Sequence, residues 1–292
     1  MSANTFSQRF RSIVNENLPA GLRAATRGVR QTKERWRQDL RLWRLRCQIR
    51  ALKPGSTTQC LGYSLQVNDR DNFYTLYKDI VVNRIYHFEA QRPDPLILDC
   101  GSNIGMSILY FKWVYPRARI IGFEPDTEVF PYLERNVEKN GLQGVRLVQA
   151  ALSSKEGLIE FFSDGKYGSS LSEEAFARSD LRWTRSSVSS VRLRSYLDEP
   201  VDFLKMNIEG AEYEVLKNSE EKLDQVKEMV IEYHHLPGLP RNLHKILEIL
   251  DRHRFEYLIN DFDSETNGIV KPPFKLAPDS RYFLLIYAKR LA

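Results

Sequence analysis

The segment "LILDCGSNIGMSIL", residues 96 to 109, places an acid and two glycines directly after a short apolar run. Gly101 and Gly105 let the backbone turn sharply and come close to a ligand, because neither residue has a Cβ atom. The pattern is D-x-G-x-x-x-G, which differs from the dinucleotide fingerprint G-x-G-x-x-G. Asp99 suits a ligand end that carries an ammonium group, and its charge would repel a pyrophosphate. The loop predicts a site for a cationic ligand end, with a simple packing turn as the alternative.

Glu124, at the end of the apolar run "RIIGFE" (residues 119–124), is the second candidate residue. A carboxylate at the end of a second strand can accept hydrogen bonds from two ribose hydroxyls. A ribose together with an amino-acid ammonium group describes S-adenosylmethionine better than NAD. The glycine loop by itself is equally compatible with a packing turn, and Glu124 is the residue that favours a cofactor site.

The most specific cluster lies in "LDEPVDFLKMNIEGAEYEVL", residues 197–216. A predicted strand ends at Asn207, and Glu209 and Glu212 follow on either side of a glycine. Carboxylates in such a place indicate a positioned acid, base or polar clamp. Glu212 is also explained as an acid that interacts with the dipole in the first turn of a helix. Glu209, in the strand-to-helix loop, is therefore the stronger candidate for chemistry.

Two histidines, His234 and His235, come at the end of the predicted strand "KEMVIEYH" (residues 227–234). An imidazole titrates near neutral pH, so either residue could act as a general base. Glu209 is the rival candidate for that role. The alternative for each histidine is that it packs or caps a neighbouring element.

The elements that must position these residues follow from an alternation of short β-rich runs and amphipathic helices. The predicted strands are 96–100, 119–124, 145–150, 201–207, 227–234, 255–260 and 281–289, and the predicted helices are 104–115, 127–140, 211–218 and 242–253. Such an alternation indicates an α/β fold with a mainly parallel sheet covered on both faces. The candidate residues then meet at the carboxyl edge of the sheet, where such folds bind ligands. The last two strands have no helix between them and are expected to form an antiparallel edge pair.

Three segments are expected along the chain: a basic, helical N-terminal extension (1–54), a mixed lead-in with aromatic residues that could wall a substrate site (55–95), and the cofactor-binding domain (96–292). Residues 1–53 contain 13 Lys and Arg against three Asp and Glu, whereas the rest of the chain has a net charge of −5. The extension is expected to pack its apolar stripe on the main domain. Peripheral contact with an anionic membrane and RNA binding are the alternatives.

The composition points to a cytoplasmic protein, with a location peripheral to the membrane as the alternative. The chain has no uncharged apolar run long enough to span a bilayer and no apolar stretch typical of a secretory signal. Its three cysteines, Cys47, Cys60 and Cys100, are widely separated and form no C-x-x-C pair. Neither a disulfide framework nor a thiolate metal site is expected.

The sequence resembles the FkbM family of S-adenosylmethionine-dependent methyltransferases. The resemblance covers roughly residues 96 to 235 and is carried by "LILDCGSNIG", by "IIGFEPD" with "ERNVEKNGL", and by "YLDEPVDFLKMNIEGAEYEVLKN" followed by "VIEYHH". It implies a Rossmann-like class I methyltransferase fold, with a mainly parallel seven-stranded sheet whose last strand is antiparallel. It also implies O-methylation of a hydroxyl on a sugar, glycoconjugate or natural product, for which a general base helps because an aliphatic hydroxyl is a poor nucleophile.

The resemblance also implies a set of cofactor-binding residues. The methionine end would be lined by Asp99, Gly101, Ser102, Asn103 and Gly105, the ribose would be held by Glu124, the adenine would lie near Ala151 and Leu152, and Asn207 would face the methyl and methionine region. The family usually has an aspartate where this chain has Asn207. The amide keeps a hydrogen-bond acceptor but loses charge and basicity, so neither a base nor a metal ligand is expected there.

The expected acceptor is a hydroxyl of a small molecule or glycan. One alternative is a nucleic-acid methyltransferase that uses the basic N-terminal segment as its electrostatic handle. The net charge of −5 on the rest of the chain and the absence of an N/D-P-P-Y motif argue against it. A second alternative is a non-catalytic cofactor-binding module, in which Asn207 would mark the loss of catalysis.

Overall fold

The computed structural model describes residues 40–164, 169–170, 183–236, 239–261 and 282–291, apart from positions 41, 44 and 48. The chain divides into two compact units, residues 1–51 and 52–292. In the first unit the described positions from 40 to 49 are helical, and most of the predicted extension lies outside the described residues. In the part of the chain that is described, no helix has the length and apolar character needed to cross a membrane.

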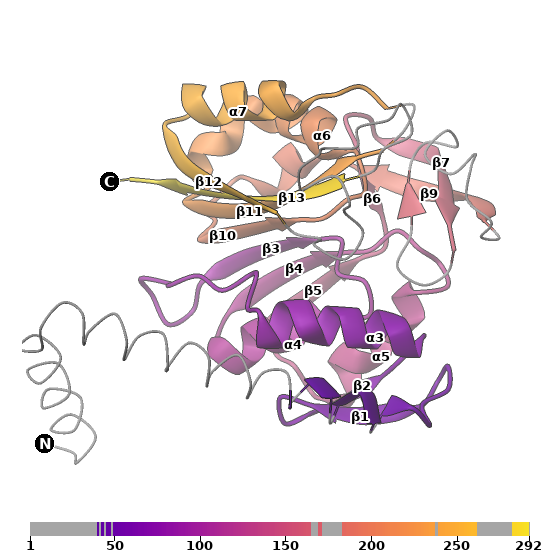
Figure 1. The fold of residues 1–292 in the computed structure, drawn as a ribbon. Coiled ribbons are helices and arrows are strands. Elements are labelled where there is room, and N and C mark those ends of the chain that lie inside the picture. The colour runs from indigo at the N-terminus through magenta and orange to yellow at the C-terminus, as the bar shows by residue number, and fades with distance from the viewer. Residues whose placement is uncertain are drawn as a thin grey trace, which may run out of the picture. The chain divides into compact units, whose positions relative to one another are not determined.

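A seven-stranded sheet forms the centre of the second unit (Figure 1). Its strands, in spatial order, are β12 (Phe255–Asp261), β13 (Tyr282–Arg290), β11 (Glu228–His235), β10 (Phe203–Met206), β3 (Leu96–Cys100), β4 (Arg119–Phe123) and β5 (Val145–Val148). The strands from β11 to β5 pair in parallel, and β13 is antiparallel to both of its neighbours. The prediction of a class I methyltransferase sheet with an antiparallel last strand is confirmed, as is the antiparallel pairing of the last two strands at one edge.

Helices cover both faces of this sheet (Figure 1). On one face lie α3 (Arg70–Leu76), the π-helix η1 (Tyr77–Val82), α4 (Met106–Val114) and α5 (Phe130–Lys139). The other face carries α6 (Glu212–Ser219) and α7 (Leu243–Arg252), with two 3-10 turns at Leu193–Tyr196 and Glu220–Gln225. Strands between two helical layers need apolar residues on both faces, which explains the near-continuous apolar runs in the sequence.

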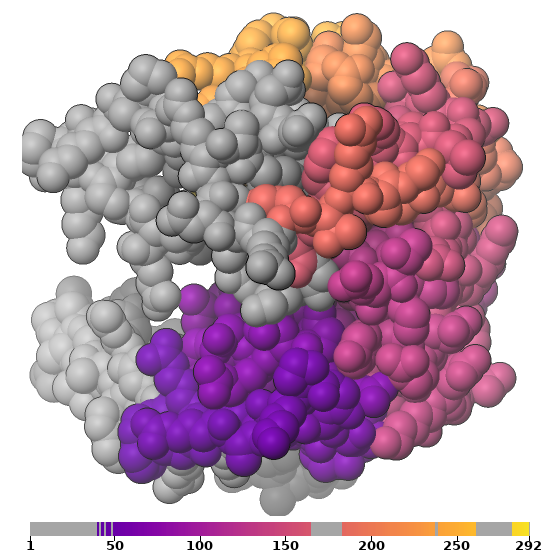
Figure 2. Space-filling view, turned by 90° about the vertical axis from the view of Figure 1, so that its right-hand side faces the viewer, coloured from indigo at the N-terminus to yellow at the C-terminus, as the bar shows by residue number. Residues whose placement is uncertain are grey.

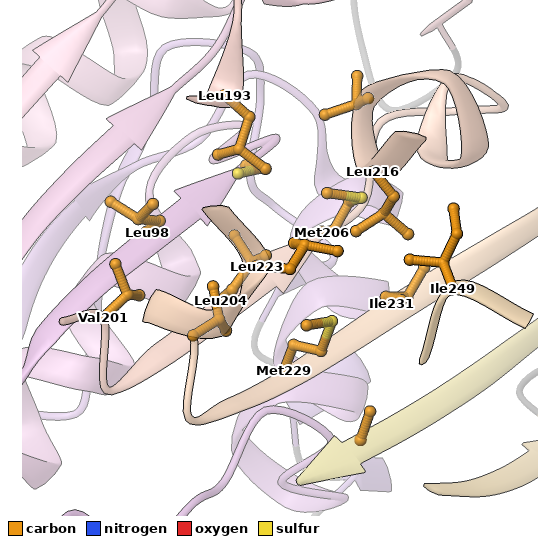
Figure 3. Close-up of a cluster of buried hydrophobic side chains, with 14 of the residues drawn as sticks. Leu98, Leu193, Val201, Leu204, Met206, Leu216, Leu223, Met229, Ile231 and Ile249 are labelled. Carbon is orange, nitrogen blue, oxygen red and sulfur yellow. The ribbon is translucent and has the colours of Figure 1, made fainter. Parts of the chain in front are cut away.

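The core on the α6 and α7 face is built from the central strands. Met206 and Ile231, on neighbouring strands, point toward Leu216 of α6 and Ile249 of α7 (Figure 3). All four side chains are buried. Burial of apolar side chains of this size contributes about 1.5 to 3 kcal/mol each. This packing holds the carboxyl ends of β10 and β11 in a fixed relation, and those ends carry Asn207, Glu209 and the two adjacent histidines.

A second sheet is inserted between β5 and β10. Its strands, in spatial order, are β6 (Ala151–Leu152), β9 (Thr184–Val191), β7 (Gly157–Ser163) and β8 (Ser169–Ser170). In Figure 2 this region, in pink to orange, lies between the C-terminal elements at the top and the lead-in elements in indigo at the bottom. The sequence analysis placed no strand between residues 150 and 201. Pairing of β7 with β9 joins residues that are distant in the chain, so the local pattern does not show it.

Side-chain amides connect the lead-in segment to the loop that follows β3. It contains the hairpin of β1 (Thr57–Cys60) and β2 (Tyr63–Gln66), followed by α3 and η1. Asn136 of α5 accepts a hydrogen bond from the Gln66 backbone N–H at 2.7 Å and donates to the carbonyl oxygens of Gln66 and Ile104. The hairpin is thereby connected to the loop that follows β3.

Candidate active site

The glycine loop between β3 and α4 adopts left-handed backbone conformations at three positions. Gly101, Asn103 and Gly105 have φ values of +84°, +49° and +90°. The backbone N–H groups of Gly101 and Ser102 both donate to the Phe123 carbonyl oxygen, at 3.0 and 2.8 Å, which fixes the loop on the end of β4. A Cβ on Gly101 would lie 1.9 Å from the Asn207 carbonyl oxygen. Only glycine fits at this position, because the loop packs directly against the end of β10.

Glu124 and Asn103 are brought together at the end of β4. Glu124 Oε2 accepts a hydrogen bond from the Asn103 backbone N–H at 2.8 Å, and Oε1 accepts from the Asp126 backbone N–H at 3.0 Å. Burial raises the pKa of Glu124 to about 7, although both N–H donors oppose the shift. A carboxyl group that changes charge near neutral pH therefore lies beside the glycine loop.

Asn72, on α3, supports the left-handed residue of the loop. Its Nδ2 donates to Asn103 Oδ1 at 3.0 Å, and Asn103 Oδ1 also accepts from the Ile104 backbone N–H at 2.8 Å. Asn72 is fully buried. The sequence analysis did not select Asn72, because nothing in its local pattern distinguishes it from other polar residues of a helix.

Asp99 lies inside the protein, below the loop. Its side chain is fully buried, and Oδ2 accepts a hydrogen bond from the Ser107 hydroxyl at 2.6 Å. Its Oδ1 lies 3.3 Å from Lys205 Nζ, an ion pair without the alignment of a hydrogen bond. In the described structure Asp99 supports the loop from within, and a direct contact with a ligand stays a prediction.

Lys205 is another residue of this region that the sequence analysis did not select. It is buried in β10, and its ammonium group donates to the carbonyl oxygens of Cys100, at 3.3 Å, and Gly101. The same ammonium lies 5.3 Å from the centre of the Tyr86 ring. Lys205 thus joins the end of β3, the start of the glycine loop and the lead-in segment.

Asn207, Glu232 and Tyr86 form a hydrogen-bonded group at the end of β10. Asn207 Nδ2 donates to Glu232 Oε2 at 2.8 Å, and the Tyr86 hydroxyl donates to Glu232 Oε1. Burial raises the pKa of Glu232, and burial together with the charge of Glu232 raises the pKa of Tyr86. An aspartate at 207 would face the carboxylate of Glu232 at hydrogen-bond distance, where two like charges repel. The amide suits its neighbour, because its NH₂ group donates to the carboxyl oxygen of Glu232.

His234 lies between two carboxylates at the end of β11. Its Nδ1 is 2.9 Å from Glu212 Oε1, and its Nε2 is 3.4 Å from Glu209 Oε2. Burial lowers the pKa of His234, but Glu209 and Glu212 outweigh that effect and raise it to about 10. Burial raises the pKa of Glu209 to about 7. At neutral pH His234 is a cation that orients Glu209, and Glu209 is the group able to take up a proton.

His235 is separated from this cluster, because successive residues of a strand point to opposite faces. Its ring stacks on Tyr282 with centroids 4.5 Å apart. Burial, with the charge of Arg241, lowers its pKa. Of the two adjacent histidines, only His234 lies with Glu209 and Glu212.

The remaining predicted residues lie in the glycine loop and in β6. The Ser102 hydroxyl donates to the Asp99 carbonyl oxygen at 3.0 Å, and Gly105 is the last residue before α4. Ala151 and Leu152 form β6 and are buried. The described part of the chain contains no group of three or more His, Cys, Asp or Glu side chains arranged to hold a metal ion.

A small pocket adjoins the histidine cluster. It has a volume of about 170 Å³ and is lined by Gly210, Glu212, Tyr213, Glu214, Tyr233, His234, Leu239, Pro240 and Asn242. Gly210 has a φ of +100°, and its backbone N–H donates to Glu212 Oε1 at 3.0 Å. The carboxylate of Glu212 is therefore fixed between the turn after β10 and His234.

Replacing Glu209 with glutamine is expected to lower the pKa of His234 from about 10 toward its ordinary value of 6.5, because one of the two adjacent carboxylates is lost. The raised pKa contributes stability that is fully present below pH 6.5 and is lost as the pH rises through about 10, so in the variant this loss should begin at lower pH. The pKa can be measured from the imidazole resonances in an NMR pH titration. Glu214→Gln, at an exposed acid in the first turn of α6, is the matched control. An unchanged His234 pKa in Glu209→Gln would contradict the pairing.

The chain is similar to known methyltransferases. The profile of the Methyltransferase FkbM domain matches residues 99–257, just over half of the chain. The methyltransferase sdnD of Sordaria araneosa is 30% identical over 207 residues, which are 59% of this chain and 79% of that protein. The 2-O-methyltransferase NoeI of Sinorhizobium fredii is 28% identical over 159 residues, 49% and 65% of the two chains. The 31-O-demethyl-FK506 methyltransferase FkbM of Streptomyces tacrolimicus is 26% identical over 213 residues, 62% and 80% of the two chains.

The profile match begins at Asp99 and extends past His235, so it contains the glycine loop, Glu124 and the ends of β10 and β11. These segments lie on a sheet with the strand order expected for a class I methyltransferase. The match to more than half of the chain decides the assignment: the protein belongs to the FkbM family of methyltransferases.

Proposed function

We propose that this protein is an S-adenosylmethionine-dependent O-methyltransferase that acts on a hydroxyl of a small molecule or glycan. The observation that carries the proposal is the arrangement of Gly101, Asn103 and Glu124, a tight glycine loop beside a buried carboxyl group at the end of the second strand of the sheet. The names of two relatives support the hydroxyl acceptor. NoeI is named a 2-O-methyltransferase, and FkbM is named a methyltransferase of 31-O-demethyl-FK506.

The residues present fit this cofactor. Gly101 and Gly105 adopt left-handed backbone conformations, which keep the loop in a tight turn at the end of β3. Glu124 would hold the ribose hydroxyls, the residues of the glycine loop would hold the methionine end, and Ala151 and Leu152 would flank the adenine. When bound, S-adenosylmethionine supplies an activated methyl group.

The protein's own contribution to the reaction is to orient the acceptor and to remove its proton. Glu209 is the proposed general base, because its pKa of about 7 matches neutral conditions and its side chain is about a quarter exposed (23%). His234, held as a cation between Glu209 and Glu212, keeps the Glu209 carboxylate in place. The proton of the acceptor hydroxyl would move to a Glu209 carboxylate oxygen.

The proposed domain organisation assigns cofactor binding to residues 96–292 and a supporting role to the lead-in, residues 55–95. The lead-in delivers Asn72 to the glycine loop and Tyr86 to the end of β10. Such contacts support a lead-in that closes one side of the site. Residues 1–54 are proposed as a basic, helical N-terminal extension, as the sequence pattern indicates.

Binding of S-adenosylmethionine is expected to tighten as the pH rises through about 7, the pKa of Glu124. The ionised carboxylate accepts hydrogen bonds from both ribose hydroxyls, whereas the protonated form loses one acceptor, so the ionised form binds better. Glu124→Gln should bind at least about tenfold more weakly at high pH and should lose this pH dependence. Isothermal titration calorimetry between about pH 6 and pH 8 measures both effects.

Glu199→Gln, at an exposed carboxylate paired with Arg119, is the matched control and should bind like the wild type. Two results would count against the proposal. A folded wild-type protein that binds no S-adenosylmethionine would remove the cofactor assignment. An unchanged pH dependence in Glu124→Gln would show that Glu124 does not hold the ribose.

A further inference from the structure

Asn207 lies at the junction of β10 and the glycine loop. Its backbone N–H donates to the Cys100 carbonyl oxygen at 3.0 Å, and its own carbonyl oxygen is the atom that excludes a Cβ from Gly101. Its side chain is partly exposed, whereas Tyr86 and Glu232 are buried. Asn207 is therefore the member of this group that can reach a ligand in the loop.

Glu232 determines which way the Asn207 amide points. Both oxygens of the Glu232 carboxyl group act as acceptors, one toward Asn207 and one toward Tyr86, so the amide turns its NH₂ group toward Glu232. The observed geometry agrees, since Asn207 Nδ2 lies 2.8 Å from Glu232 Oε2. The Tyr86 hydroxyl donates to the other oxygen, Oε1, and so holds the carboxylate from the opposite side. Asn207 Oδ1 then lies on the branch of the amide directed away from Glu232.

The ammonium group of the proposed cofactor needs acceptors beside the loop. Asp99 cannot supply one without rearrangement, because its side chain is fully buried and engaged by Ser107 and Lys205. The Gly101 carbonyl oxygen already accepts from Lys205. The Asn207 amide oxygen is a neutral acceptor at the same junction, and an amide oxygen binds a cationic donor well.

We propose that Tyr86 and Glu232 are positioning residues, which orient the Asn207 amide so that its oxygen accepts a hydrogen bond from the ammonium group of the cofactor's methionine part. This inference rests on the proposed function. It assigns a ligand-orienting role to the lead-in segment, from which Tyr86 comes, and to the acid of β11, which is otherwise a buried strand residue.

The test compares two probes that differ in the amino-acid part. S-adenosylhomocysteine carries the ammonium group, and methylthioadenosine lacks the whole amino-acid end. Calorimetric titrations of the full chain with both probes would compare the wild type with Tyr86→Phe and Glu232→Gln. Tyr110→Phe is the matched control, because Tyr110 is also buried and its hydroxyl bonds to His87 outside the site. A thermal unfolding curve for each variant checks that it is folded.

The expected result is that Tyr86→Phe and Glu232→Gln bind S-adenosylhomocysteine at least about tenfold more weakly, with less than about a twofold change for methylthioadenosine. Tyr110→Phe should leave both affinities unchanged. Equal weakening of both probes, or no weakening of either, would overturn the positioning role while leaving the proposed function in place. A wild type that binds neither probe would overturn the proposed function, and this inference with it.

Discussion

Replacing Lys205 with methionine is expected to lower the free energy of unfolding by about 3 to 5 kcal/mol, the range measured when one partner of a buried ion pair is removed. Lys205 and Asp99 are both almost completely buried, with Nζ and Oδ1 3.3 Å apart. Without the ammonium group, Asp99 keeps only the Ser107 hydroxyl as a donor. The Gly101 carbonyl oxygen loses the Lys205 donor, and the Cys100 carbonyl oxygen keeps only the Asn207 backbone N–H. The loss of stability follows from an uncompensated charge in the interior.

The charge left on Asp99 is the expected cause of this loss, and a second substitution can test it. The double variant Lys205→Met with Asp99→Asn should recover part of the stability, because the amide carries no charge. Urea unfolding of the single and double variants measures both effects.

Lys289→Met is the control for the loss of an ammonium group from a strand. Lys289 pairs with Glu228 at 3.0 Å on neighbouring strands, but its side chain is about half exposed (53%). Exposed pairs contribute about 0 to 1 kcal/mol. If Lys205→Met lowers the free energy of unfolding no more than Lys289→Met does, the buried ion pair does not hold the glycine loop to β10.

Gly101→Ala is expected to lower the free energy of unfolding by about 2 to 5 kcal/mol, the sum of backbone strain and a steric clash. A residue with a side chain at a φ of +84° carries strain of about 1 to 2 kcal/mol. In addition, the new Cβ would lie 1.9 Å from the Asn207 carbonyl oxygen, so the loop must move away from β10. The movement should also weaken the binding of S-adenosylmethionine.

The chain contains a matched control for the strain alone. Gly62, in the turn between β1 and β2, has a φ of +86°, and no atom lies within 4 Å of an added Cβ. Gly62→Ala should lower the free energy of unfolding by only about 1 to 2 kcal/mol and should leave the binding of S-adenosylmethionine unchanged. Urea unfolding and calorimetry of the two variants separate strain from clash. If the two variants lose the same free energy of unfolding and bind S-adenosylmethionine equally well, the contact with Asn207 does not constrain the loop.

The fold could be predicted from local patterns because its signals extend over only a few residues. Apolar runs between turn residues marked the central strands, and a glycine after an acid marked the loop at the end of β3. Parallel strands bring their carboxyl ends to one edge, which places Asp99, Glu124 and Asn207 in one region. The inserted second sheet was missed, because the pairing of β7 with β9 joins residues that are distant in the sequence.

By itself, the sequence determined the fold class, the family and the segments that meet at the ligand edge. The tertiary structure decided which side chains act together. Lys205, Glu232 and Tyr86 have no distinguishing local pattern, and they acquire their roles from partners on other elements. His234 and His235 are adjacent and identical in type, yet only His234 lies between carboxylates. Burial and neighbouring charge set a pKa and a hydrogen-bond direction, and both depend on packing between segments that are far apart in the chain.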